Sequence, residues 1–115
     1  MRRGDIYWVD LEPSRGSESN KVRPAVIVSN DAANRSVERL GRGIVTVVPI
    51  TSNTARILPF QTLLHAEDCG LTVDSKAQAE QVRAVAAERV GTRIGTLPPA
   101  TLRQIDDALR THLVL

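Results

Sequence analysis

The sequence predicts a small, mostly β-stranded barrel with one amphipathic helix at its C-terminal end. Five or six short runs of β-branched and aromatic residues alternate with turn-forming segments along the chain. After the last run, leucine and isoleucine recur at spacings of three and four residues, as on one face of a helix. With 115 residues, 42% of them hydrophobic, the chain can build one core, so we expect a single domain over residues 1–115.

The first two strands are expected on either side of a polar loop. Asp5 to Leu11 is rich in β-formers, and Pro24 to Ser29 is a second such run whose proline is tolerated at a strand start. Residues 12–21 contain turn formers without periodicity and are too many for a tight hairpin. We therefore expect an exposed, mobile loop there, followed by Arg23, which the next proline holds extended.

A third strand is predicted from Ile44 to Thr51. Before it, Asn30 or Asp31 can cap a short helical turn, and a charged, glycine-containing connection follows from Arg35 to Gly43. Apolar residues point to both faces of this strand, which is typical of a central strand or a subunit contact. Pro49 cannot donate a ladder hydrogen bond, so it predicts an edge or a bulge near the strand's end.

The rest of the chain alternates short strands with helical segments. Strands are predicted at Phe60–Leu64, Lys76–Val82 and Arg93–Thr96, with one helical turn at Ala86–Val90. Pro98-Pro99 then suits a helix start. The apolar stripe that predicts the C-terminal helix consists of Leu102, Ile105, Leu109 and Leu113.

Composition excludes several classes of protein. Three aromatic residues, Tyr7, Trp8 and Phe60, are too few for an RNA recognition motif, which stacks base after base on such rings. The lone Cys69 forms no intramolecular disulfide, and two distant histidines make no zinc cluster, so we expect no metal and no cofactor. Without a signal peptide or a membrane-spanning segment, the chain is expected in the cytoplasm, away from membranes.

Charge is distributed unevenly although the net charge is only +2. Residues 1–56 carry nine Lys and Arg against six Asp and Glu, whereas residues 57–115 carry six against seven. A surface that binds a polyanion is therefore expected mainly from the first half. Such a small excess is also common on ordinary soluble surfaces.

Candidate chemistry comes from polar residues at strand ends, because no G-x-S-x-G, H-E-x-x-H or Walker A motif is present. Arg23 follows the polar loop, and Thr51 to Thr54 offer hydroxyls and an amide that can donate to phosphate oxygens. Taken alone, these residues also fit a surface salt bridge and a hydrogen-bonded turn. Glu80 and Gln81 equally fit ordinary strand residues, and Cys69 fits a small buried turn residue.

Five segments together resemble the MazF/PemK family of toxin endoribonucleases. In chain order they read RGDIYWVDL (3–11), GSE (16–18), VRPAVIVSND (22–31), VPITS (48–52) and AEQVR (79–83). The resemblance runs nearly end to end and includes the closing helix, so it is far more specific than any one motif.

The resemblance implies an SH3-like barrel, of the kind found in CcdB and MazF, that forms a homodimer. It implies the toxin of a type II toxin–antitoxin system, which cuts single-stranded RNA (messenger RNA, with ribosomal and transfer RNA as alternatives) at short motifs and inhibits translation and growth. Cleavage would proceed without metal, by attack of the 2′-hydroxyl, and leave a 2′,3′-cyclic phosphate and a 5′-hydroxyl. The implied partner is a MazE-like antitoxin whose acidic C-terminal tail covers the RNA groove.

By position, Arg23 matches the family's catalytic arginine and Thr51 its catalytic threonine. The resemblance further implies a substrate-binding set of Arg15, Ser17, Glu18, Asn20, Ser52, Asn53 and Gln81. An arginine fork plus hydroxyl donors can stabilise a dianionic phosphorane. Because a guanidinium rarely gives up its proton, we expect an electrostatic role for Arg23 rather than proton transfer.

Two other readings stay open at the level of sequence. CcdB-like toxins use the same barrel to bind DNA gyrase without cleaving nucleic acid, and a relative without catalytic activity would bind RNA or protein only. Arg23, with Thr51 at the end of the next strand, favours the nuclease. A homodimer is also expected from the residues alone, because the third strand is apolar on both faces and the chain ends in Leu113-Val114-Leu115.

Overall fold

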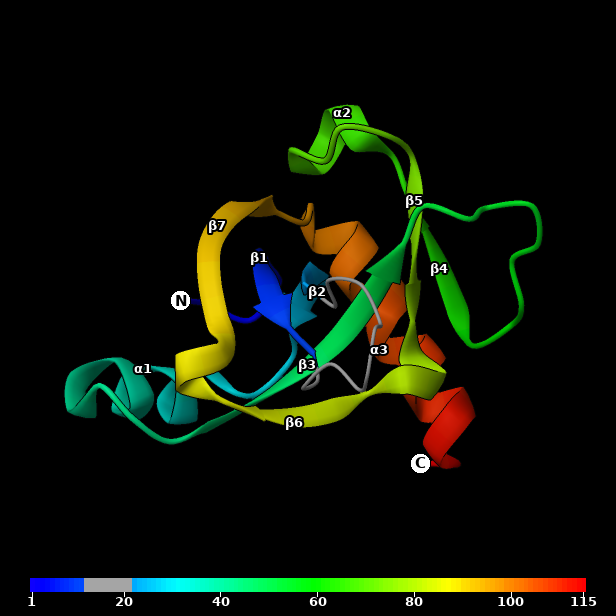
Figure 1. The fold of residues 1–115 in the computed structure, drawn as a ribbon. Helices are drawn as coiled ribbons and strands as arrows, with labels where there is room; N and C mark the ends of the chain where they lie inside the picture. Colours follow the sequence, from blue (N-terminus) through cyan, green and yellow to red (C-terminus); the bar gives the residue numbers. More distant parts are fainter. Residues whose placement is uncertain (12–21) are drawn as a thin grey trace, which may run out of the picture.

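The computed structural model describes residues 1–11 and 22–115 (Figure 1). Within them the strands are β1 (Asp5–Asp10), β2 (Val22–Ile27), β3 (Ile44–Thr51), β4 (Gln61–Leu64), β5 (Ser75–Gln78), β6 (Arg83–Ala86) and β7 (Val90–Thr96). The helices are α1 (Asp31–Leu40), α2 (Ala66–Cys69) and α3 (Pro99–Leu113), and two 3₁₀ turns are η1 (Ala79–Gln81) and η2 (Ala87–Arg89). A mostly β fold with a C-terminal helix, as the sequence predicted, is confirmed. No described helix is both long and apolar enough to cross a membrane.

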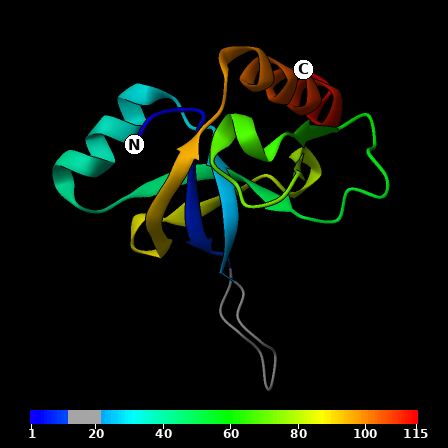
Figure 2. The same cartoon turned by 90° about the horizontal axis from the view of Figure 1, so that it is seen from above.

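The strands form one curved, antiparallel sheet in the order β4-β5-β3-β2-β1-β7, and β6 pairs with the first half of β3. Residues 44–47 of β3 pair with β6, whereas Ile50 and Thr51 pair with β5. Figure 1 shows β7 bending around the N-terminal side of the sheet, and Figure 2 shows α1 and α3 lying apart from each other at its periphery. The central position predicted for the third strand is therefore confirmed.

Two clusters of buried apolar side chains form the core on opposite faces of the central strands. One cluster includes Ile6, Val26, Val48 and Ile105, the last of which comes from α3. The other contains the alternate residues of the same strands together with Val37 from α1. Since side chains of a strand alternate between faces, a helix on each side buries both sets of residues.

The helix α1 corrects a prediction, because the sequence indicated only one helical turn before a charged connection. Charged residues obscure its amphipathic character, but Asn34 and Val37 are buried. Asn30 Oδ1 caps the helix by accepting a hydrogen bond from the backbone N–H of Ala33 at 2.8 Å. Gly41, with a φ of 69°, ends it in the left-handed conformation that glycine favours.

The strands after residue 75 also differ from the prediction. The strand expected at residues 76–82 ends at Gln78, and the chain makes the 3₁₀ turn η1 before it starts β6, which was not predicted. The last strand is longer than expected, because β7 begins at Val90. The helical turn expected near residues 86–90 is confirmed as η2. The described residues therefore contain seven strands, where five or six were expected for the chain.

Pro49 lies neither at an edge nor in a bulge, contrary to the prediction. It pairs with Ala25 in a regular ladder between β2 and β3. On the other side of β3, Val47 is the last residue paired with β6 and Ile50 is the first paired with β5. Pro49, which has no backbone N–H, thus lies between the part of β3 that pairs with β6 and the part that pairs with β5.

Candidate active site

A cleft of about 580 Å³ lies where β2 and β3 meet the loop after α2. Its lining comes from the start of β2, the end of β3, the segment 70–75, and single residues or short stretches of β1 and β7. The residues that line it are Trp8, Arg23, Pro24, Ile50, Thr51, Ser52, Gly70, Leu71, Thr72, Val73, Ser75, Arg93 and Ile94. The cleft therefore gathers residues that are far apart in the sequence.

Both residues predicted to be catalytic line this cleft. The ladder between β2 and β3 ends at the pair of Ala25 and Pro49, and Arg23 and Thr51 each lie two residues beyond this pair on neighbouring strands. Arg23 is exposed, and its guanidinium has no hydrogen bond or ion pair among the described residues. Its five N–H donors are thus free to bind an anion in the cleft.

A short turn fixes the hydroxyl of Thr51. The backbone N–H of Asn53 donates to Thr51 Oγ1 at 3.3 Å, and the N–H of Ala55 donates to Asn53 Oδ1 at 3.2 Å. Because Thr51 Oγ1 accepts this hydrogen bond, its own proton remains available for a ligand. The segment is therefore the hydrogen-bonded turn that the sequence offered as one alternative, and Thr51 and Ser52 also line the cleft.

The predicted substrate-binding residues fall into three groups. Ser52 lines the cleft beside Thr51. Asn53 shapes the turn, and Gln81 is exposed on η1, so neither lines the cleft. The remaining four, together with the mobile loop expected at residues 12–21, lie outside the described residues: Arg15, Ser17, Glu18 and Asn20.

Trp8 is a cleft residue that the sequence analysis did not single out. Its side chain is 44% exposed, and it is the only tryptophan of the chain. The ladder between β1 and β7 pairs Tyr7 with Arg93 and Val9 with Val90, so two residues of β7 oppose Trp8 alone. Such a bulge redirects side chains at the edge of a site. The alternation of side chains along β1 places Trp8 on the same face as Ile6, and this alternation is the sequence feature from which its position could have been predicted.

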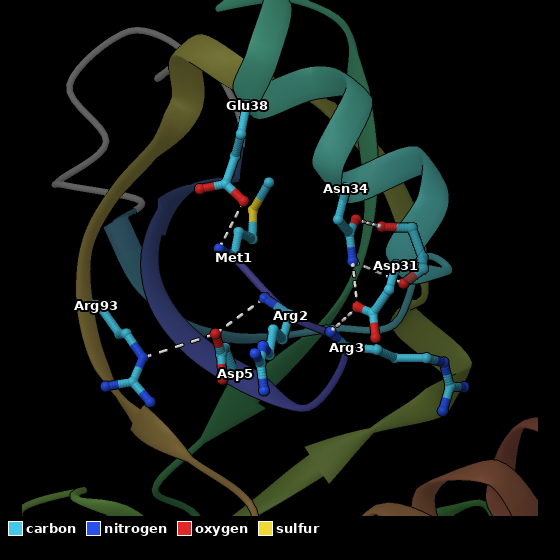
Figure 3. A network of polar contacts seen from close by, with 9 residues as sticks. Met1, Arg2, Arg3, Asp5, Asp31, Asn34, Glu38 and Arg93 are labelled. Atoms are coloured by element: carbon cyan, nitrogen blue, oxygen red, sulfur yellow. Dashed lines mark hydrogen bonds and ion pairs between the residues drawn. The ribbon is translucent and has the colours of Figure 1, made fainter.

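Arg93 is a second cation that borders the cleft, and it belongs to a polar network near the N-terminus (Figure 3). Its Nε lies 3.6 Å from Oδ2 of Asp5, a carboxylate that is largely buried and that also accepts a hydrogen bond from the N–H of Arg2. The N–H of Arg3 donates to Asp31 Oδ1 at 2.7 Å and lowers the pKa of that carboxyl. Asp5 thus partly neutralises Arg93, which leaves Arg23 as the better anion ligand.

The wall at residues 70–75 is fixed to β7 by a close backbone contact. A Cβ at Gly95 would overlap the carbonyl oxygen of Cys69, and a Cβ at Gly70 would lie 2.7 Å from the carbonyl oxygen of Ile94. Gly70 also has a φ of 86°, which disfavours other residues. Two glycines are therefore required where the wall meets the strand.

The histidines and the cysteine lie outside the cleft lining. His65 Nδ1 is 3.9 Å from Asp74 Oδ2 at the exposed start of α2, whereas the ring of His112 is 6.1 Å from that of Phe60. Burial raises the pKa of the Cys69 thiol, so it stays protonated at neutral pH and is a poor nucleophile. Among residues 1–11 and 22–115, no cluster of three or more His, Cys, Asp or Glu side chains could hold a metal ion.

Comparison with known proteins agrees with the resemblance noted from the sequence. Residues 2–113 match the model of the family described as PemK-like, MazF-like toxins of type II toxin–antitoxin systems. Endoribonuclease MazF9 of Mycobacterium tuberculosis (strain ATCC 25618 / H37Rv) is 59% identical over 115 residues, which cover all of this chain and 98% of the relative. Endoribonuclease EndoA of Bacillus subtilis (strain 168) is 32% identical over 115 residues, covering all of this chain and 96% of the relative.

A solved structure with a similar fold is an endoribonuclease from a mycobacterial species in complex with its cognate antitoxin. It shares 30% identity and a TM-score of 0.78, over all of this chain and 96% of that one. Fold and sequence thus agree with the resemblance, and Arg23 and Thr51 line one cleft. This chain belongs to the family of PemK-like, MazF-like toxins of type II toxin–antitoxin systems.

Proposed function

We propose that this chain is a sequence-specific endoribonuclease that cleaves single-stranded RNA without a metal and thereby inhibits translation and growth. The observation that carries the proposal is the cleft that Arg23, which has no partner among the described residues, lines together with the oriented hydroxyl of Thr51. Relatives that match the whole chain are named endoribonucleases, which supports a nuclease over the CcdB-like alternative that binds gyrase. Messenger RNA is the expected target class, with ribosomal and transfer RNA as alternatives.

The proposed chemistry uses a nucleophile that RNA itself provides. The 2′-oxygen attacks the adjacent phosphorus and gives its proton to water, a P–O2′ bond forms, and the P–O5′ bond breaks as the 5′-oxygen takes up a proton from water. Arg23 would stabilise the dianionic phosphorane through its fork of N–H donors, and Thr51 would donate its free hydroxyl proton to a non-bridging oxygen. Neither step requires the guanidinium to lose a proton.

Product chemistry tests this proposal. Digestion in EDTA should proceed and leave a 2′,3′-cyclic phosphate and a 5′-hydroxyl, because internal attack needs no metal-bound water. Sequencing of the 5′ ends of the fragments gives the recognition motif. An RNA with 2′-deoxy sugar at the mapped site should then bind nearly as well but remain uncut. Fragments with 5′-phosphates, or cleavage of the 2′-deoxy substrate, would contradict the mechanism.

Trp8 is proposed to stack on a base next to the phosphate that Arg23 binds. An exposed aromatic face in a cleft that holds RNA offers about 1–3 kcal/mol per stacked base. We expect Trp8→Ala to raise KM roughly tenfold, and Trp8→Phe to lose less. Because Trp8 is the only tryptophan, its fluorescence should be quenched when the 2′-deoxy RNA binds. Unchanged fluorescence at saturating RNA would show that no base stacks there.

A homodimer is proposed from apolar surface that the single chain leaves exposed. Val114 and Leu115 are 88% and 84% exposed, and Leu113 precedes them at the end of α3. Sedimentation equilibrium should therefore give about twice the chain's 12.5 kDa. Loss of the dimer on replacing Leu113 by Glu would locate the contact on α3. A monomer at micromolar concentration would contradict this assembly.

The proposed partner is a MazE-like antitoxin whose acidic C-terminal tail occupies the cleft. The solved mycobacterial relative in complex with its cognate antitoxin supports a partner of this kind. The unpaired cation Arg23 would attract acidic side chains as it attracts phosphate, so the tail would compete with RNA, and more weakly at high salt. We also propose that the chain forms a single domain with an SH3-like barrel fold. Its proposed location is the cytoplasm. The bending of the sheet around its core supports the barrel.

A further inference from the structure

Lys76 is a buried cation behind the cleft. Its side chain is only 9% exposed, and it lies on β5, where the ladder to β3 pairs it directly with Thr51. Paired residues of an antiparallel ladder carry their side chains on the same face, so the lysine stem runs on the face of Thr51. Lys76 is not among the residues that line the cleft.

The ammonium of Lys76 holds the turn that follows Thr51. Lys76 Nζ donates to the backbone oxygen of Arg56 at 2.6 Å. The same turn begins with the hydrogen bonds from Asn53 to Thr51 and from Ala55 to Asn53. Lys76 therefore fixes the far end of a chain of contacts whose near end orients the Thr51 hydroxyl.

A second anchor holds the loop further along. Gln61 Oε1 accepts from the N–H of Leu58 at 2.9 Å, and Gln61 Nε2 donates to Glu80 Oε2 at 2.7 Å. This anchor fixes residues 58–61 from β4 and η1 and does not reach residues 52–57. Without Lys76, the segment between Thr51 and Leu58 would keep only its local hydrogen bonds.

The burial of the Lys76 ammonium indicates that this residue does more than fill space in the core. An ammonium taken out of water is costly, and buried lysines occur almost only where they are paired. A methionine would fill similar space without that cost. The ammonium is thus retained at a place where its contact with the backbone of Arg56 fixes a proposed catalytic group.

We propose that Lys76 is a positioning residue for Thr51, which it keeps in its productive orientation by holding the carbonyl of Arg56. The inference rests on the proposed nuclease function. It predicts that loss of the ammonium lowers kcat and leaves KM nearly unchanged, because the cleft lining remains complete. A misplaced catalytic group slows reactions by about 10- to 100-fold.

A double-mutant cycle tests the link to Thr51. Lys76→Met should reduce kcat by ~10-fold or more, and Lys76→Arg, which keeps a donor, should recover part of the rate. In a Thr51→Val background, Lys76→Met should change the rate by less than about twofold. The matched control is Arg103→Met, which removes one exposed charge from α3 and should cut normally. Equal losses in both backgrounds would overturn the proposal.

Amide exchange tests the anchor without any substrate. In Lys76→Met, amides of residues 53–58 should exchange faster, whereas those of α3 should be unchanged. Faster exchange throughout the chain would mean that Lys76 only stabilises the fold, and unchanged exchange at residues 53–58 would mean that it does not hold the turn. If the wild-type chain cuts no RNA, the proposed function fails, and the exchange result still decides whether the anchor exists.

Discussion

Replacing Arg23 by alanine is expected to slow RNA cleavage by roughly 100-fold or more. The guanidinium is exposed and has no partner among the described residues, so its removal leaves no buried group unpaired and the fold should persist. The loss would come from the phosphorane, which no longer meets a preorganised cation. Arg23→Lys should recover little, because a point charge does not reproduce two parallel N–H donors. Single-turnover rates, with thermal unfolding as a check of the fold, measure both effects.

The histidines supply the control for this assignment. Neither His65 nor His112 lines the cleft, so alanine at either position should leave cleavage nearly normal. An inactive histidine variant with an intact fold would point to histidine acid–base catalysis and show that the role given to Arg23 is wrong.

Gly95→Ala is expected to have the largest effect on stability, a loss on the order of 3 kcal/mol or more in the free energy of unfolding. The new Cβ would overlap the carbonyl oxygen of Cys69, and because backbone rather than a flexible side chain blocks it, α2 and β7 would have to separate. Denaturation in urea measures the loss.

Gly41→Ala is the matched control for this prediction. Nothing lies within 4 Å of a Cβ at Gly41, so only its left-handed backbone opposes the change, at about 1–2 kcal/mol. If the two variants unfolded at the same urea concentration, the contact between α2 and β7 would not be the constraint that the structure indicates.

The elements that the sequence predicts well are those with a regular hydrophobic period. The β3 run and the leucine stripe of α3 are examples, since β3 buries most of its apolar residues and α3 packs Leu102, Ile105 and Leu109 on the core. The pattern fails at α1, where charged residues leave only Asn34 and Val37 buried, and at β7, where the register shifts opposite β1 break the alternation.

The candidate site was predictable only in part, for a related reason. A sequence shows that Arg23 and Thr51 stand near strand ends, but the register that brings them beyond the same end of one ladder follows from the pairing of β2 with β3. The place of Trp8 in the cleft could not be predicted, because the cleft forms only when the loop at residues 70–75 lies beside it. The place of Lys76 could not be predicted either, because lysine is normally a surface residue and its burial depends on the turn that covers it.

The cleft combines two kinds of scaffold, and this has a consequence for how such a protein can diversify. Arg23 and Thr51 stand on central strands, whereas Leu71, Thr72 and Val73 belong to a loop that Gly70 joins to β7 and that the Ser75 hydroxyl holds through the backbone oxygen of Val73. Leu71 packs against the core, so mutations at Thr72 and Val73 are the ones that change what a ligand meets without disturbing the central strands. If the proposed site holds RNA, we expect a library randomised at residues 72 and 73 to yield variants with altered motif preference that still cut RNA at the proposed catalytic pair.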